Sequence, residues 1–175
     1  MGRTASGDRE AFRLILERHE ARVFHFALAL LRSEDAAADV TQDAFLVLLR
    51  NPGAYDPGRG GLGSFLLGIA RNLVLKEFRR RKREAAEEVP ADGMPGRDAP
   101  AGLELERRER AARLREAVAS LSPAQQQVLT LRFQQELDLQ GIAGLMLLPL
   151  NTVKSHLRRA ILSLREATGG GDDGL

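Results

Sequence analysis

The stretch Asn151–Glu166, NTVKSHLRRAILSLRE, combines an apolar stripe with a basic face, and the interpretation of the whole chain starts from it. Its large apolar side chains recur at spacings of four, four and three residues, as one face of an α-helix requires. They are Val153, Leu157, Ile161 and Leu164. The opposite face is polar and basic and carries no acid before Glu166. The pattern predicts a docked helix whose outer face is either solvated or shaped to lie against a polyanion.

A second short helix is expected just before this one, over residues 137–148, with a break at Leu148–Pro149. Two short helices with a tight break, the second one basic, follow the order of a helix-turn-helix. In that motif short polar groups reach base edges in the major groove, and longer cations reach phosphates. The candidate DNA-contacting residues are Asn151, Thr152, Lys154, Ser155, His156, Arg158 and Arg159. A core-packed helix with a solvated face explains the same pattern, so both interpretations stay open at this point.

Further helices are expected on the N-terminal side of the motif. Residues 103–121 form a charged amphipathic segment, and residues 122–135 begin with a helix-start signature. Ser122 stands at the N-cap, Pro123 at the first helical position and Gln125 at the capping-box position. The sequence therefore predicts a C-terminal helical domain over 106–168.

The first half of the chain also has helical periodicity. Residues 8–32 are expected to be helical, with a break or bend near the polar ERHEAR of residues 17–22. Ser33 is the expected N-cap of a helix over 34–50, and the Gly- and Pro-rich residues 51–64 are expected to form a loop. Helical spacing resumes at Phe65 and continues into a basic end. These elements predict an N-terminal helical bundle over 7–84.

Charge is unevenly distributed between the two halves. Residues 76–83, KEFRRRKR, contain six basic residues and one acid, and the sign reverses directly after them. Residues 85–105 are acidic and contain the Pro- and Gly-rich VPADGMPGRDAPAG, which predicts a flexible acidic linker. The predicted fold is therefore all-α, with two small helical domains joined by this linker. Two basic helices on either side of an acidic spacer indicate two contacts with one polyanion, or two solvated faces.

The composition restricts the function classes. The chain has no Cys, which excludes disulfides and thiol chemistry and fits the cytoplasm. Its N-terminus lacks the apolar core of a signal peptide, and no apolar run is long enough for membrane insertion. The sequence shows no nucleophile–base pair, no phosphate-binding glycine loop and no spacing of metal ligands. We therefore expect no enzyme activity, no catalytic residue, no cofactor and no metal.

Five motifs, in order along nearly the whole chain, give it a family resemblance. LSPAQQQVLTLRF (121–133) and IAGLMLLPLNTVKSHLRRA (142–160) resemble the C-terminal domain of bacterial sigma factors of the extracytoplasmic-function type, in the sigma-70 family. EDAAADVTQDAF (34–45) resembles their polymerase-binding helix, YDPGRG (55–60) their loop, and FLLGIARN (65–72) their promoter-melting helix. Together these motifs are far more specific than any one of them.

The resemblance implies an alternative sigma factor that binds core RNA polymerase, at its clamp helices and flap, and directs promoter recognition, DNA melting and initiation. Residues 7–84 match region 2, which binds polymerase and recognises the minus-ten element, and residues 106–168 match region 4, which recognises the minus-thirty-five element. The implied polymerase-binding residues are Asp39, Gln42 and Asp43. The implied minus-ten residues are Asp56, Arg59, Arg71, Asn72, Lys76, Arg79 and Arg80. An anti-sigma protein is the other implied partner.

Several positions depart from the family pattern. Phe65 stands where Trp is usual, Lys76 where an acid is usual, and His156 where Arg is frequent. Leu147 occupies the position of the usual turn glycine, and Asn151 that of another frequent glycine. If the turn requires a positive φ, Leu147 costs about 1 kcal/mol or more, because its Cβ clashes there. We expect a reshaped or strained turn.

Two other function classes compete with this interpretation. A conventional helix-turn-helix transcriptional regulator would share the TVKSHL segment (152–157), but it would carry a receiver or ligand domain with alternating strands, which residues 1–84 do not predict. A protein-interaction module of amphipathic helices would leave both basic clusters and the glycine-rich loop without a role.

Overall fold

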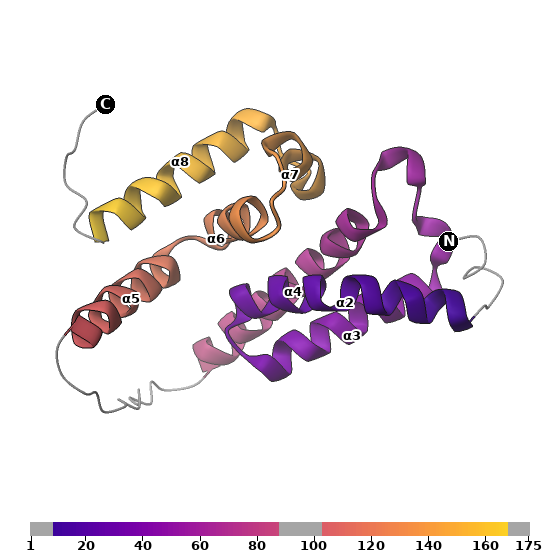
Figure 1. Cartoon of the computed structure of the whole chain (residues 1–175), viewed down its shortest axis with the longest axis horizontal. Helices are drawn as coiled ribbons and strands as arrows, with labels where there is room; N and C mark the ends of the chain where they lie inside the picture. The colour runs from indigo at the N-terminus through magenta and orange to yellow at the C-terminus, as the bar shows by residue number, and fades with distance from the viewer. Residues whose placement is uncertain (1–8, 88–102, 168–175) are drawn as a thin grey trace.

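The computed structural model describes residues 9–87 and 103–167, with side chains for 9–84 and 111–167. Within these ranges every regular element is helical, which confirms the all-α prediction (Figure 1). The elements are α2 (Arg9–Leu31), α3 (Glu34–Arg50), the 3₁₀ turns η1 (Pro52–Ala54) and η2 (Pro57–Arg59), α4 (Leu62–Glu87), α5 (Leu103–Ser120), α6 (Pro123–Leu129), the π-helical turn η3 (Thr130–Gln134), α7 (Leu139–Met146) and α8 (Leu150–Ala167).

The N-terminal bundle consists of α2, α3 and α4, each in contact with the other two. Its core is closed by fully buried side chains from all three helices, among them Phe26, Leu48 and Leu66. Helix α2 runs without interruption from Arg9 to Leu31, so the break expected near residues 17–22 is wrong. Glu, Arg and Ala are strong helix formers, and a polar run of them exposes a helix to solvent without interrupting it.

The helix starts agree with the cap signatures. Ser33 Oγ accepts a hydrogen bond from the backbone N–H of Ala36 at 3.3 Å, and α3 follows. At the start of α6, Ser122 and Gln125 form both bonds of a capping box, at 2.9 and 3.4 Å. Each cap satisfies backbone donors that a helix leaves open at its first turn. Both predicted N-caps are confirmed.

The C-terminal unit places α8 against α5, α6 and α7. Val153 and Ala160 are fully buried, and Leu157, Ile161 and Leu164 are half-buried, so the predicted stripe is the docking face of α8. Helix α7 and helix α8 are separated by a short turn around Pro149. The two helices have the order of the predicted helix-turn-helix.

The turn after α7 adopts the left-handed conformation that favours glycine. Leu147 has φ 54° and ψ 43°, and the backbone N–H groups of Leu147 and Leu148 donate to the carbonyls of Gly144 and Ala143 at 3.4 and 3.1 Å. This bond pair is a Schellman motif, which needs a left-handed residue at the position of Leu147. The Leu147 side chain is 82% exposed, so packing compensates little of the cost. The expectation of a strained turn is confirmed.

The linker boundaries differ from the expected 85–105. Helix α4 continues to Glu87 and α5 begins at Leu103. At each end, three residues of the expected linker are therefore helical. Glu and Ala at the end of α4 and Leu and Glu at the start of α5 favour helix despite their place in an acidic segment. Residues 88–102, which include most of the predicted linker, lie outside the described residues.

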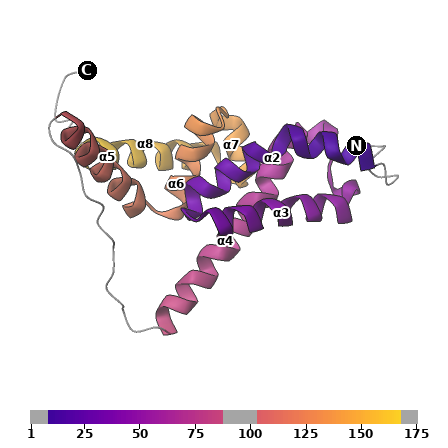
Figure 2. The same cartoon turned by 60° about the horizontal axis from the view of Figure 1, so that its bottom comes forward.

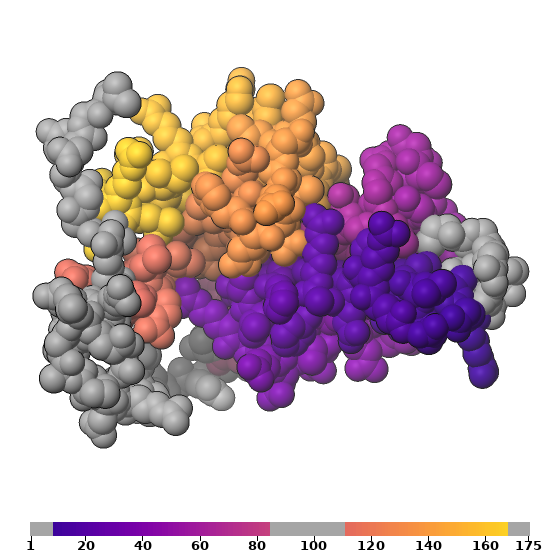
Figure 3. All heavy atoms as spheres, viewed as in Figure 1, coloured from indigo at the N-terminus to yellow at the C-terminus, as the bar shows by residue number. Residues whose placement is uncertain are grey.

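The two helical units pack against each other. Helix α7 contacts α4, and both α6 and η3 contact α2. One hydrophobic cluster contains core residues of both units, including Leu67 and Val74 of α4 and Val128 and Ile142 of the C-terminal unit. Figures 2 and 3 show α6 and α7 lying over the bundle, and Figure 2 shows the C-terminal end of α4 projecting away from it. The free chain is therefore closed.

The left-handed turn makes a stability prediction. We expect Leu147→Gly to raise the free energy of unfolding by about 1 kcal/mol, because glycine adopts positive φ without a Cβ clash. Leu147→Ala is the matched control, since it keeps the Cβ and should gain little. Urea unfolding followed by circular dichroism measures both variants. Equal stabilities for the glycine and alanine variants would contradict the strain at this position.

Candidate nucleic-acid interface

Helix α4 presents a polar and basic stripe along one side. Asn72, Lys76, Arg79 and Arg80 are exposed, and their spacing of four, three and one residues puts them on one helical face. The C-terminal part of α4 extends beyond the other helices (Figure 2). An extended basic stripe can follow a phosphate backbone, and the Asn72 amide can form a pair of hydrogen bonds to a base edge.

Arg80 is already paired within its own helix. Its Nη2 and Nε bind the two carboxylate oxygens of Glu77 at 2.6 and 2.8 Å, and its Nη1 binds Glu84 at 2.6 Å. Glu77 also accepts a bond from Arg81 at 2.8 Å, and Arg81 donates to the Leu31 carbonyl at 3.0 Å. The arginines, Arg80 foremost, lower the pKa of Glu77 to about 2. A phosphate at Arg80 would therefore have to compete with two carboxylates, whereas Arg79 has no ion pair among the described residues.

The loop before α4 is ordered by its own polar groups. Asp56 accepts a hydrogen bond from the Gly58 N–H at 2.9 Å and caps η2, and the Tyr55 hydroxyl donates to the Gly60 carbonyl at 3.2 Å. Gly60 has φ 139°, a conformation that side chains rarely adopt. The centroids of the Tyr55 and Phe65 rings are 5.6 Å apart, so Phe65 anchors the loop through an apolar contact.

Arg59 and Asp56 are both exposed at this loop. Arg59 is free to approach a phosphate, while the carboxylate of Asp56 has a structural role in the cap. The two predicted minus-ten residues of the loop therefore lie together, but only Arg59 carries a charge that attracts a phosphate.

Arg71 lies apart from the exposed stripe. It is half-buried and its Nε donates to Gln127 Oε1 of the C-terminal unit at 2.9 Å, with a longer 3.4 Å bond from Nη1 to Asn72. Burial lowers the pKa of the Arg71 guanidinium, and no carboxylate among the described residues pairs with it. Of the predicted minus-ten residues, Arg71 is the one that the C-terminal unit covers.

The outer face of α8 is open to solvent. Asn151, Lys154, Ser155, Arg158 and Arg159 are exposed, and Thr152 and His156 are half-buried. All seven belong to the first three turns of α8, and the described residues contain no acid partner for Lys154, Arg158 or Arg159. Short groups in the middle and cations on the flanks form a surface suited to a major groove.

The three acidic and amide residues of α3 are brought together as expected. Asp39, Gln42 and Asp43 are all exposed on the face opposite the buried Val40 and Ala44. Gln42 also lies at the rim of a groove between α2 and α3, whose apolar lining includes Phe12, Leu16, Phe24 and Phe45. A polar row beside an apolar groove is typical of a protein-binding surface.

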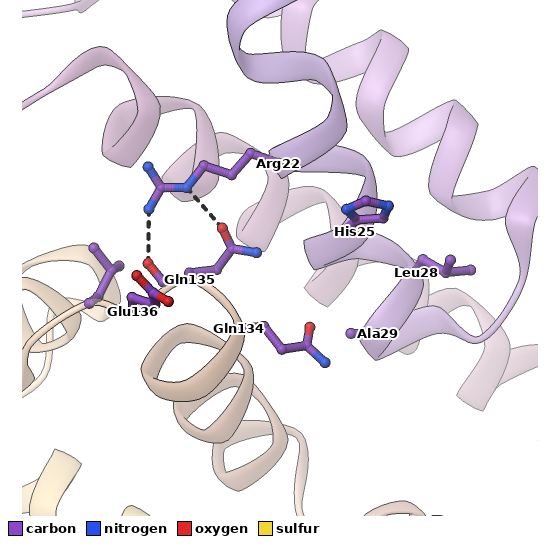
Figure 4. Close-up of a pocket in the computed structure, with 8 residues that line it drawn as sticks. Arg22, His25, Leu28, Ala29, Gln134, Gln135 and Glu136 are labelled. Carbon is purple, nitrogen blue, oxygen red and sulfur yellow. Dashed lines mark hydrogen bonds between the residues drawn. The ribbon is translucent and has the colours of Figure 1, made fainter.

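Sequence reasoning missed Arg22 and Gln135. Arg22 Nε donates to Gln135 Oε1 at 2.8 Å, and its Nη2 donates to the Gln135 carbonyl at 3.1 Å (Figure 4). A Cβ added to Gly63 would lie 3.1 Å from Arg22 Nη1 and 3.3 Å from His19 Nδ1, so both side chains abut the first turn of α4. Burial, and then the charges of Arg18 and Arg22, lower the pKa of His19. In the sequence, Arg18 and Arg22 stand four residues apart, which puts both cations on one helical face. This spacing was the signal that could have identified Arg22.

The described residues include no group of three or more His, Cys, Asp or Glu side chains arranged to bind a metal ion. Among the described helices, none combines the length and the apolarity that a bilayer crossing requires.

Two family models match the chain. Sigma-70 region 2 matches residues 15–84, and Sigma-70 region 4 matches residues 111–164. The first match spans α2 to α4 with the loop, and the second contains most of α5 and the helix-turn-helix. The matches and the two helical units therefore coincide.

Curated relatives and solved structures agree with these matches. An ECF RNA polymerase sigma factor named SigK from Mycolicibacterium vanbaalenii is 29% identical over 171 residues, covering 94% of this chain and 85% of SigK. The ECF sigma factor BldN from Streptomyces coelicolor is 30% identical, covering 93% of this chain and 62% of BldN. RpoE from Bartonella quintana, solved with the anti-sigma factor NepR, superposes with a TM-score of 0.71 at 22% identity, covering 93% of this chain and 99% of RpoE. CnrH, solved with the cytosolic domain of CnrY, has a TM-score of 0.70 at 19% identity, covering 98% of this chain and 96% of CnrH.

The Glu77 cluster makes a pH-dependent prediction. We expect Glu77→Gln to lower the free energy of unfolding at about pH 7 by up to about 1 kcal/mol, because it removes a carboxylate paired with two partly exposed arginines. The folded pKa of about 2 lies below the ordinary 4.5, so the stabilisation is complete above about pH 4.5 and is lost as the pH falls towards 2. Urea unfolding at about pH 7 and pH 3 measures the difference between variant and wild type, which should shrink at the lower pH. Glu84→Gln, which changes a more exposed ion pair, is the control and should have a smaller effect. A difference in the free energy of unfolding between Glu77→Gln and wild type that is the same at both pH values would contradict the role of the Glu77 carboxylate.

Proposed function

The chain belongs to the sigma-70 family, as an alternative sigma factor of the extracytoplasmic-function (ECF) type, and from this premise we propose which of its faces bind core RNA polymerase and which bind promoter DNA. Region 2 comprises the bundle of α2, α3 and α4, and region 4 comprises α5 to α8. The single observation that carries the assignment is the sign of the charge on each exposed face. The acidic row lies on α3, and the basic faces lie on α4 and α8.

The α3 face with Asp39, Gln42 and Asp43 is our proposed docking surface for the clamp helices of polymerase. Its exposure and the apolar groove beside Gln42 support this choice, because protein interfaces combine an apolar centre with a polar rim. The flap of polymerase is the proposed partner of region 4. An anti-sigma protein is the other proposed protein partner, and we propose a cytoplasmic location, where polymerase and promoters meet.

The minus-ten element is proposed to bind along α4 and the loop before it. Asn72, Lys76 and Arg79 form the exposed stripe, and Arg59 and Asp56 flank the glycine-rich loop. Arg71 and Arg80 belong to the same proposed set once their present partners are released. DNA is melted without ATP when the separated strand is bound tightly enough to offset lost pairing and stacking, so the proposed mechanism is binding and not catalysis.

The minus-thirty-five element is proposed to bind the outer face of α8. Lys154, Arg158 and Arg159 would bind phosphates, and Asn151, Thr152, Ser155 and His156 would meet base edges. His156 in place of a frequent Arg gives up a permanent charge, so base contact by its imidazole depends on hydrogen bonding alone. The assignment of this face is supported by the exposure of its side chains in the closed chain.

Run-off transcription with core polymerase on a randomised promoter library tests the function. The wild-type chain is expected to produce transcripts and to select a promoter sequence. Replacing Asp39 and Gln42 together by alanine should abolish co-purification with core polymerase and all transcripts, because it removes the polar row of the docking face. Glu166→Ala, which removes an exposed carboxylate at the far end of α8, is the control and should assemble normally. Normal assembly of a folded double variant would refute the α3 assignment.

The α8 assignment makes a separate prediction about salt. We expect Arg158→Ala or Arg159→Ala to weaken binding of the holoenzyme to promoter duplex, and to reduce the slope of log affinity against log salt by about one, as one lost phosphate contact requires. Fluorescence anisotropy over a range of salt concentrations measures the slope. Arg113→Ala, at an exposed arginine of α5, is the control. An unchanged slope in both variants would remove these arginines from the DNA face.

A further inference from the structure

Leu147 has the most exposed large apolar side chain in the described part of the chain. It is 82% exposed, whereas its neighbour Met146 is buried, and Leu145 and Leu148 pack against the hydrophobic cluster. The packing of α7 against α8 therefore uses the residues on both sides of Leu147 and leaves its own side chain in water. Contact between water and an apolar side chain is unfavourable, so this leucine adds nothing to the stability of the fold.

The backbone at Leu147 adds a second cost. Its φ of 54° and ψ of 43° are left-handed, a conformation that glycine adopts without a Cβ clash. The Schellman motif at this turn is made by backbone N–H and carbonyl groups, so it requires the conformation and not the side chain. Single exposed leucines are ordinary on protein surfaces, but non-glycine residues held in a left-handed conformation gather at functional sites. The combination of strain and exposure indicates a role outside the fold.

The turn places Leu147 next to the proposed minus-thirty-five face. Figure 1 shows α7 beside the N-terminal end of α8, and the two helices are in contact. Leu147, Pro149 and Asn151 are exposed, whereas Leu148 and Val153 belong to the packed side of the motif. The exposed side of the turn is therefore continuous with the outer face of α8 at its first residues. In a helix-turn-helix these N-terminal residues of the second helix contact base edges, so Leu147 lies at the border of the groove.

The chemistry of leucine restricts what Leu147 can recognise there. Its side chain has neither a donor nor an acceptor, so it can favour an apolar group only. In the major groove the apolar group of the bases is the C5 methyl of thymine, which cytosine lacks. Most of the other side chains proposed for this face offer hydrogen bonds or charge, and Thr152, which also carries a methyl group, is half-buried.

We propose that Leu147 is a specificity-determining residue of region 4, whose side chain contacts the C5 methyl group of a thymine at the edge of the minus-thirty-five element. The proposal rests on the proposed function of α8 and adds the turn before it to the DNA-reading surface. Contact with the methyl group removes apolar surface of both partners from water, which offsets the strain of the turn in the complex. Glycine would form the turn without strain but would offer no side chain to the methyl group.

Removal of single methyl groups from the DNA tests this contact. The promoter selected by the holoenzyme from the randomised library supplies the minus-thirty-five element. Each thymine of either strand is replaced in turn by deoxyuridine, which pairs as thymine does but lacks the C5 methyl. Fluorescence anisotropy measures the affinity of the holoenzyme for each duplex. With the wild-type chain we expect one of these replacements to weaken binding about four-fold, as the loss of one buried methyl group implies.

The same duplexes are then measured with variants of Leu147. In holoenzymes with Leu147→Gly or Leu147→Ala, the sensitive deoxyuridine should no longer weaken binding, because the side chain that met the methyl group is gone. Leu147→Met keeps an apolar side chain of similar length and should retain most of the four-fold effect. The glycine variant is expected to be more stable than the wild type, so its loss of discrimination cannot result from unfolding.

Two further variants are the controls. Leu162→Ala changes another exposed leucine of α8, 45% exposed and far from the turn, and should respond to deoxyuridine as the wild type does. Thr152→Ser removes the nearby methyl group of the protein and keeps the hydroxyl. If Thr152→Ser abolishes the response to deoxyuridine while Leu147→Gly does not, Thr152 makes the contact and the proposal fails.

Failure of this proposal is distinguishable from failure of the α8 assignment. A selected element that contains no thymine in either strand, or equal responses to deoxyuridine in the wild type and in Leu147→Gly, would overturn the contact. If Arg158→Ala still reduces the salt slope in that case, the α8 face binds DNA without Leu147. If neither Leu147 nor the α8 arginines affect binding, the proposed minus-thirty-five surface itself fails.

Discussion

Two arginine–glutamine contacts connect the halves of this protein, Arg22 with Gln135 and Arg71 with Gln127, and the second lies beside the face of α4 that is proposed to bind DNA. A guanidinium group remains charged in proteins and offers five donors in a fixed plane, so a half-buried arginine must find acceptors. In the closed chain those acceptors are Gln127 and Gln135. The face of α4 nearest region 4 is consequently covered, while the outer faces of α8 and α3 stay exposed.

The interface combines an apolar cluster shared by both units with hydrogen bonds between charged and neutral groups, and it contains one buried donor without a partner among the described residues. A buried donor without a partner destabilises the state that contains it. Elsewhere the chain also departs from ideal geometry: Arg32, Glu136 and Leu147 are non-glycine residues at positive φ, and each ends a helical segment.

Much of the fold and part of the site could be predicted from sequence because their signals are local. The caps at Ser33 and Ser122, the apolar stripe of α8 and the strained turn at Leu147 all involve residues within a few positions of one another. The break expected in α2 and the expected linker ends differ from the structure for a related reason, because Glu, Arg and Ala favour helix even within a polar or acidic segment. The π-helical turn η3 was missed because its single extra residue leaves no mark on hydrophobic spacing.

The sequence by itself determined which residues form each helix, which face of each is apolar, and the family to which their order belongs, because helical periodicity and capping depend on neighbours three or four residues apart. Only the tertiary structure decided the partners of the half-buried arginines. Arg71 binds a glutamine 56 residues away in the sequence, and Arg22 binds a glutamine 113 residues away. Helical periodicity cannot predict pairs at such separations. The difference is physical: burying an apolar stripe needs only a surface, whereas a half-buried cation needs one particular acceptor at hydrogen-bond distance.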